Sequence, residues 1–199
     1  MYSTKTATTN NEEFISSYMP VGINENITLK EVNVNNANGK PFLEIIFENA
    51  AGQTATMTEW KNEKNLWVKT NEDLQNRDNQ QFGRILQVID AIKGSHADFE
   101  GSSFTEMINW AKTQLEGEGA NVRIKVCYNK KGYTRVSNLG IFIEPMSVKT
   151  EESQIKLFKN DLMERPIVAD KEPATDPLTI GTIDSAPVTE TTGADDLPF

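Results

Sequence analysis

Polar and apolar residues alternate in two segments of the N-terminal third of the chain. In residues 26–34 the apolar positions change face after Leu29, which predicts a strand with a bulge. In residues 41–60 the alternation is interrupted at Gly52, which predicts a hairpin of two strands. Three consecutive antiparallel strands are therefore expected. The apolar positions that define them are Ile27, Leu29, Val32, Val34, Leu43, Ile45 and Phe47.

Between about residues 74 and 116 the spacing of the apolar residues changes to the period of an α-helix. The first run of apolar residues ends at Gly94, a helix stop, and Ser103 with Glu106 forms a capping box that opens the second run. A helical insert of two helices is therefore predicted. Its apolar positions are Phe82, Ile85, Leu86, Ile89 and Ile92, followed by Phe104, Met107, Ile108, Ala111 and Leu115.

Alternation returns in residues 122–126, and a turn composition at residues 129–132 leads into a long return strand over residues 133–143. Three strands, a helical insert and two strands are the order of an OB-fold, a partly open five-stranded barrel. An α+β sandwich would give a similar pattern. We expect a mainly β (α+β) domain over residues 14–149, folded as an OB-fold barrel with a helical insert.

The segments outside this domain differ in composition. Residues 1–13 are rich in Thr and Asn, with almost no apolar residues, so we expect them to be disordered. Residues 150–165 have apolar residues at a spacing that allows one more helix. Residues 166–199 contain seven acidic residues and Lys171. This segment is expected to be a disordered acidic tail, because it has little to bury and repels itself.

Charge is unevenly distributed along the 199 residues. The net charge is -9, of which residues 150–199 contribute -7, with eleven acidic and four basic residues. Residues 121–135 contain five basic residues and no acidic one, so this hairpin is expected to carry a positive field. Two tyrosines lie among the cations, a mixture that suits DNA because cations contact phosphates and rings stack on bases. The candidate DNA contacts are Arg123, Lys125, Tyr128, Lys130, Lys131, Tyr133 and Arg135. The alternative is a hairpin tip that is basic for solubility, with tyrosines packed on the barrel.

A second mixture of aromatic and basic residues follows the third predicted strand. Its candidate DNA contacts are Trp60, Lys61, Lys64, Trp67 and Lys69. One of the two tryptophans could instead cap the barrel. Trp110 lies on a helical pattern and is expected to pack in the domain. Glu44 and Glu48 have no partnering base or metal motif and are expected to form a solvated face.

Several functional classes are excluded by what the sequence lacks. Cys127 and His96 are single, which excludes a zinc site and a disulfide framework and suits a reducing cytoplasm. No phosphate-binding loop, dinucleotide fingerprint, hydrolase elbow or zinc-protease motif occurs, and most general-base arrangements lack a base, so we expect no catalytic residue, cofactor or metal. No apolar run approaches the ~18 to 20 residues that cross a bilayer, and no signal peptide is recognisable, so no membrane association is expected.

The most specific motif is formed by the last five residues, Asp195, Asp196, Leu197, Pro198 and Phe199. Two acids, an aliphatic residue, a stiff proline and a final Phe beside a carboxylate are typical of a ligand that docks to another protein. A complementary receptor would offer an apolar pocket rimmed by Lys or Arg. We expect this tip to be a partner-docking site.

An OB-like strand pattern, an acidic linker with Pro and Thr, and the ending Asp195–Phe199 occur in this order. In these features the chain resembles the bacterial single-stranded DNA-binding protein (SSB) family and its bacteriophage counterparts. The resemblance implies that the barrel coats single-stranded DNA without sequence preference, and that the tip recruits replication, recombination and repair proteins. It also implies a location in the bacterial cytoplasm, including that of a phage-infected host.

The chain departs from the bacterial members of this family in two features. About sixty residues separate the third and fourth predicted strands, and no glycine- and glutamine-rich linker is present. A bacteriophage member is therefore the better match, and the oligomeric state stays open. One rival hypothesis is a β-rich adaptor or virion protein that docks partners through the tip without binding DNA. A nuclease is a weaker rival, because the carboxylates form no spaced cluster for Mg²⁺.

Overall fold

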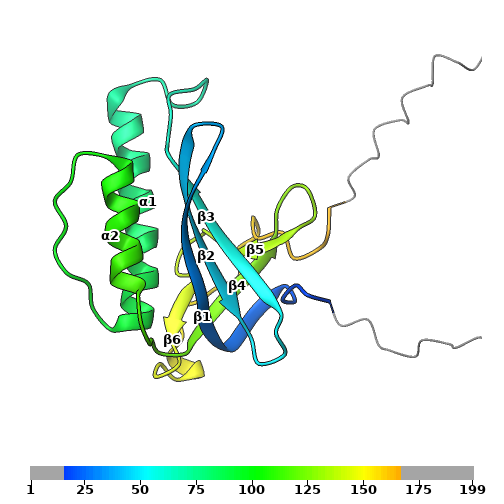
Figure 1. The fold of residues 1–199 in the computed structure, drawn as a ribbon. Helices are drawn as coiled ribbons and strands as arrows, with labels where there is room; N and C mark the ends of the chain where they lie inside the picture. The colour runs from blue at the N-terminus through cyan, green and yellow to red at the C-terminus, as the bar shows by residue number, and fades with distance from the viewer. Residues whose placement is uncertain (1–15, 167–199) are drawn as a thin grey trace, which may run out of the picture. The chain divides into compact units, whose positions relative to one another are not determined.

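The computed structural model describes residues 16–166 (Figure 1). In this part of the chain two α-helices lie between the third and fourth strands of a β-sheet. The elements are β1 (Gly22–Ala37), β2 (Lys40–Glu48), β3 (Thr54–Trp60), α1 (Asn71–Lys93), α2 (Phe104–Leu115), β4 (Val122–Tyr128), β5 (Thr134–Val136), β6 (Ile143–Pro145) and a short 3-10 helix (Thr150–Glu152).

The sheet contains six strands, and every pairing between them is antiparallel. Hydrogen-bonded neighbours follow the order β3-β2-β1-β4-β5, and β6 pairs with β4. No pairing joins β3 to β5 within the described residues, so the sheet is open and is not a closed barrel. The predicted mainly β domain with two inserted helices is confirmed. The predicted five-stranded OB-fold barrel is not confirmed, because the described residues form an open sheet of six strands.

The return strand predicted over residues 133–143 is divided into β5 and β6. Both pieces pair with β4, with Val136 opposite Val126 and Ile143 opposite Ile124. The loop between them carries the Leu139 carbonyl, which accepts a hydrogen bond from Lys125. The chain therefore pairs with the same edge of β4 at two separate places, where the sequence predicts one continuous strand.

β1 is shared between the two halves of the sheet. Its N-terminal part pairs with β4, and its part from Thr28 onward pairs with β2. The register shifts between Leu29 and Glu31, where a bulge redirects the strand. This shift confirms the bulge that the change of apolar face predicts.

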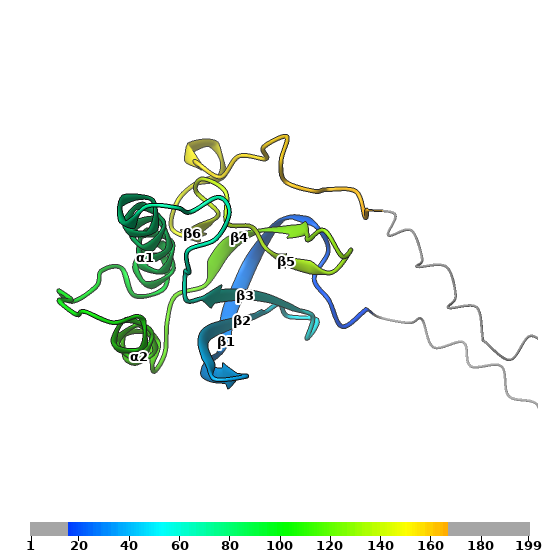
Figure 2. The ribbon, with the colours of Figure 1, turned by 90° about the horizontal axis from the view of Figure 1, so that it is seen from above.

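The two helices lie side by side on one side of the sheet (Figures 1 and 2). α1 begins with a capping box between Thr70 and Asp73 and ends at Gly94, which has a left-handed φ of 82°. α2 begins with the predicted capping box between Ser103 and Glu106. Both helix starts are therefore specified by local sequence.

The core lies between the apolar faces of the helices and the inward residues of the strands. Trp110 joins its edge, with its ring centroid 5.7 Å from that of Phe82 and 5.1 Å from that of Phe99, so its predicted packing role is confirmed. Completely buried core residues include Leu43, Ile45, Phe47, Ile85, Ile89, Ile108, Val122, Ile124 and Phe142. Among the described residues no helix is long and apolar enough to cross a membrane.

No α-helix forms over residues 150–165, so that prediction is wrong. Side chains capture the backbone N–H groups that a helix would need. The N–H of Gln154 donates to Glu144 at 2.6 Å, and the N–H of Phe158 donates to Asp161 at 2.8 Å. Apart from one 3-10 turn, the segment crosses the sheet as an irregular strap. We call residues 146–165 the covering segment.

Candidate nucleic-acid interface

Two of the predicted DNA contacts on β4 are buried ion-pair partners. The side chain of Arg123 is 3% exposed, and its Nε donates to Glu25 at 2.8 Å. Its terminal nitrogens face Glu144, the carbonyl of Val148 and the hydroxyl of Thr150. Because these groups occupy the guanidinium, the prediction that Arg123 contacts DNA is wrong.

Lys125 is also buried, with no exposed side-chain surface. Its Nζ donates to Asp161 Oδ2 at 2.8 Å, to the Lys156 carbonyl at 2.8 Å and to the Leu139 carbonyl at 2.9 Å. The Nζ also lies 4.6 Å from the ring centroid of Phe158. The prediction that Lys125 contacts DNA is therefore wrong as well. Lys125 is buried because the covering segment lies over the face of β4 that the alternating pattern assigns to solvent.

Asp161 is the acceptor that makes this burial possible. Burial raises the pKa of its carboxyl, but hydrogen bonds from Lys125, Ser137 and the N–H of Phe158 outweigh that effect and lower the pKa below its ordinary value of 3.8. The ion pair fastens the covering segment onto β4. The sequence offered one signal for this contact, which is the acidic Asp161 beside apolar residues in 155–162.

The turn between β4 and β5 presents the remaining cations of the hairpin. Lys130, Lys131 and Arg135 are exposed, and none of them has an ion-pair partner among the described residues. Asn129 organises the turn, since its Oδ1 accepts from the N–H of Lys131 at 2.8 Å and from that of Tyr133 at 3.1 Å. The backbone that carries the cations is therefore fixed while their side chains remain available.

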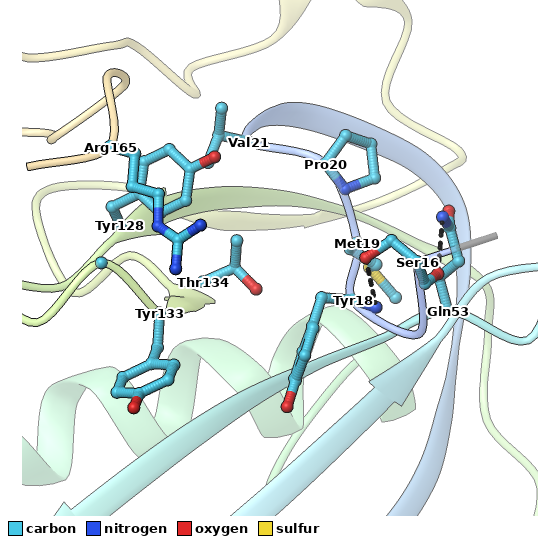
Figure 3. Close-up of a pocket in the computed structure, with 11 residues that line it drawn as sticks. Ser16, Tyr18, Met19, Pro20, Val21, Gln53, Tyr128, Tyr133, Thr134 and Arg165 are labelled. Carbon is cyan, nitrogen blue, oxygen red and sulfur yellow. Dashed lines mark hydrogen bonds between the residues drawn. The ribbon is translucent and has the colours of Figure 1, made fainter. Parts of the chain in front are cut away.

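Tyr133 lies beside a pocket of about 420 Å³ (Figure 3). Its ring is exposed, as is the ring of Tyr18, which precedes β1 and has no place in the predicted site. Arg165, at the end of the covering segment, also lines the pocket and was not predicted. Tyr128 is half-buried in the wall, where its N–H donates to the carbonyl of Leu162 at 2.8 Å.

A second aromatic site lies at the end of β3. Trp60 is 43% exposed and stacks on Phe42 of β2, with ring centroids 4.2 Å apart and an angle of 24° between the rings. The indole of Trp60 remains partly exposed in this cross-strand pair. Phe42 was not predicted, although its position opposite Trp60 follows from the hairpin register.

The connection after β3 places the other predicted residues on the surface. Trp67 is 85% exposed, and Asn65 holds the turn by accepting from the N–H groups of Trp67 and Val68. Three exposed lysines lie within six residues of it in the sequence and have no ion-pair partner among the described residues; they are Lys61, Lys64 and Lys69. The structure thus presents all five predicted residues of the 60–69 segment to solvent.

β3 connects the two aromatic sites. Tyr18 forms a β-bridge with Thr54 at the start of β3, and Trp60 is its last residue. Six steps of ~3.3 Å separate these backbone positions by about 20 Å. The tyrosine pocket and the Trp60–Phe42 stack therefore lie at opposite ends of one strand and not in a single cluster.

Two acidic residues on the outward face of β2 lie near this path. Glu48 is paired with Lys30, and Glu44 accepts a hydrogen bond from Asn35. The charge of Glu48 is thus compensated by Lys30 on β1, whereas Glu44 receives a hydrogen bond from a neutral amide. Within residues 16–166 no group of three or more His, Cys, Asp or Glu is placed to hold a metal ion.

The predicted docking tip, Asp195, Asp196, Leu197, Pro198 and Phe199, lies outside the described residues. The chain matches no protein-family model, and no curated protein is significantly similar to it. Among solved structures, the A-subunit of the AB5 toxin from E. coli is similar over 66% of this chain and 86% of its own, with 13% identity and a TM-score of 0.28. A likeness at this TM-score supports no conclusion about fold or function.

Proposed function

We propose that this protein binds single-stranded DNA without strong sequence preference, using an OB-fold. The strand order β3-β2-β1-β4-β5, the long bulged β1 and the helices between β3 and β4 support this assignment. OB-folds are partly open, and they bind oligonucleotides on the face of strands two and three and with the loops between strands one and two and between strands four and five. In this chain Phe42 and Trp60 lie on the β2–β3 face, and the exposed cations lie in the connection after β3 and in the β4–β5 turn.

The observation that carries the proposal is the pairing of exposed rings with available cations at both ends of β3. Trp60 and Phe42 form a stacking platform beside Lys61 at one end. Tyr133 lies beside Lys130 and Lys131 at the other. Rings that stack on bases and cations that follow the phosphates are the two requirements for single-strand binding without sequence readout.

A strand that contacts both sites has to span about 20 Å. At a stacked spacing of ~3.4 Å per nucleotide this is about six nucleotides, within the ~4 to 16 that an OB-fold covers.

We further propose that the protein is not an enzyme, and that Asp195–Phe199 recruits replication, recombination or repair proteins, as the resemblance to the SSB family implies.

The direct test is a gel-shift titration of the full chain with oligo(dT) and with a duplex of equal length, repeated across salt. We expect tighter binding to oligo(dT), quenching of tryptophan fluorescence, and a log-log salt slope of ~0.7 for each phosphate contact. The matched variants are Trp60→Ala, expected to weaken binding, and Trp110→Phe, which changes a packed ring away from the proposed face. Equal affinity for duplex would overturn the single-strand preference, and no affinity for either would overturn the proposal and leave the protein-docking hypothesis.

A further inference from the structure

The geometry points to a nucleotide pocket: we propose that Tyr18, Tyr133, Thr134 and Arg165 accept one unstacked nucleotide of the bound strand. This inference rests on the proposed function and assigns a distinct role to one end of the interface. The pocket of about 420 Å³ is built from the segment before β1, the β4–β5 turn and the end of the covering segment (Figure 3).

The two tyrosines are exposed side chains on a fixed backbone. Tyr18 is 58% and Tyr133 is 59% exposed, and Figure 3 shows both rings directed to the same side of the pocket. On either side of Tyr18, the N–H of Met19 donates to the Thr54 carbonyl and the N–H of Thr54 donates to the Ser17 carbonyl, both at 2.9 Å. The backbone that carries Tyr18 is therefore fixed before a ligand arrives, which reduces the ordering cost of binding.

Arg165 supplies the charge that the pocket offers to a phosphate. It has no ion-pair partner among the described residues, and no acidic residue lines the pocket. Its side chain lies against Gly132, where an added Cβ would be 3.1 Å from the Arg165 Nε. The glycine thus permits both the left-handed turn, with φ of 78°, and the close approach of the guanidinium.

Thr134 provides an independent indication of a ligand. Its Oγ1 is buried and has no hydrogen-bond partner among the described residues, although buried hydroxyls are normally paired. Figure 3 shows this hydroxyl on the side of the pocket that holds the tyrosines. Exposed side chains rotate within nanoseconds, and such a rotation would have to uncover the hydroxyl for an entering base. A hydroxyl both donates and accepts, and can therefore bond the edge of any base.

The pocket also explains a preference for single strands. A base in a duplex is stacked and paired, and would first have to leave the helix at a cost of a few kcal/mol. A base in a single strand enters without breaking a pair.

The test uses the full chain and two strands of ~8 nucleotides, oligo(dT) and the same backbone with abasic sites. On oligo(dT), Tyr133→Ala and Tyr18→Ala are each expected to lower the affinity about 5- to 150-fold, which corresponds to ~1 to 3 kcal/mol for a stacked base. Neither change should affect the abasic strand. Tyr133→Phe should retain most of the affinity. Arg165→Ala should weaken both strands, whereas Arg77→Ala on the exposed side of α1 should weaken neither.

The outcomes separate this pocket from the proposed function. If wild-type protein binds oligo(dT) and Trp60→Ala weakens it, but both tyrosine variants bind like wild type, the pocket is refuted and the function stands. If the tyrosine variants weaken the abasic strand as much as oligo(dT), the rings do not stack on a base. If the wild type binds neither strand, the proposed function fails first. Circular dichroism of each variant shows that the fold is retained.

Discussion

Lys125 and Asp161 form a buried ion pair in the part of the protein that supports the proposed interface. Two charges taken out of water are stable only when their hydrogen-bonding capacity is satisfied. Lys125 meets this condition with three acceptors, and Asp161 accepts from Lys125, Ser137 and the N–H of Phe158. The pair therefore holds the covering segment, and with it Arg165, against β4.

Replacing Asp161 with Asn should destabilise the fold by about 3 to 5 kcal/mol, because the charge of Lys125 would remain buried without its partner. Urea unfolding monitored by tryptophan fluorescence measures this change. The control is Lys40→Ala, which breaks the exposed pair with Glu63 and should have a much smaller effect. Equal destabilisation by the two variants would show that the buried pair has no special role.

The same pair predicts a dependence of stability on pH. The folded state lowers the pKa of Asp161 below 3.8, so the unfolded chain takes up the proton first as pH falls. The stabilisation is present above that ordinary value and is lost as pH falls through the lower, folded pKa. The difference in unfolding free energy between wild type and Asp161→Asn should therefore be constant near neutral pH and decrease below about pH 4. A difference that grows in acid would contradict this assignment.

Lys130 and Lys131 are exposed cations without an ion-pair partner in the described part of the chain. If each neutralises one phosphate, changing both to Ala should reduce the log-log salt slope of oligo(dT) binding by about 1.4, at ~0.7 per contact. Affinity should fall most at low salt and converge with wild type at high salt. Arg77→Ala serves as the control, and an unchanged slope would place the phosphate path elsewhere.

At the scale of elements, α1 is joined to the end of β3 by a polar clamp. Arg84 donates to Glu59 through Nε at 2.7 Å and through a terminal nitrogen at 2.8 Å. Gln81 donates to Glu59 and to the Trp60 carbonyl, both at 2.8 Å. The helical insert thus fixes the backbone of the residue that forms the stacking platform.

Replacing Arg84 with Met should cost about 1.5 to 3 kcal/mol of stability, because the carboxylate of Glu59 would lose a charged donor pair while remaining buried. The variant should also alter the fluorescence of Trp60 and weaken oligo(dT) binding less than Trp60→Ala does. Arg77→Ala on the same helix is the matched control. Binding that is unaffected while stability falls would show that the clamp serves the fold and not the platform.

The elements that local sequence specifies are the ones that could be predicted. Alternation identified β1 to β4, and the Ser103 capping box identified the start of α2. The path of residues 146–165 could not be predicted, because it depends on contacts with Glu144 and Lys125 that only the folded sheet brings near. This path decides which cations are accessible, so the burial of Arg123 and Lys125 was missed for the same reason.

The candidate site was predictable in part. Trp60, Tyr133 and the lysines near them are exposed as expected, because turns and strand ends reach solvent. Tyr18 and Arg165 were missed because they lie far in sequence from the two aromatic and basic segments that predicted the site. They join the site only through the bridge to Thr54 and through the covering segment.

At the scale of the whole molecule, the acidic C-terminal segment follows directly in the sequence after Arg165, a basic residue of the proposed pocket. Residues 167–199 begin two positions after Arg165 and contain seven acidic residues and Lys171. Because this segment is covalently attached beside the pocket, its carboxylates have a high effective concentration there. They should compete with DNA phosphates for Arg165, Lys130 and Lys131.

Changing the seven acidic residues of this segment to amides should therefore tighten oligo(dT) binding several-fold at low salt, and the gain should disappear as salt screens the charges beyond about 10 Å. The residues are Asp170, Glu172, Asp176, Asp184, Glu190, Asp195 and Asp196. Amide replacement keeps the length of the chain and creates no new terminus beside Arg165, as truncation would. The control changes the six threonines of the same segment to serine, which leaves the charge unaltered. The measurement is a fluorescence titration of both variants and wild type across salt. An affinity at low salt that does not respond to the loss of seven negative charges would show that the acidic segment and the DNA do not share a binding surface.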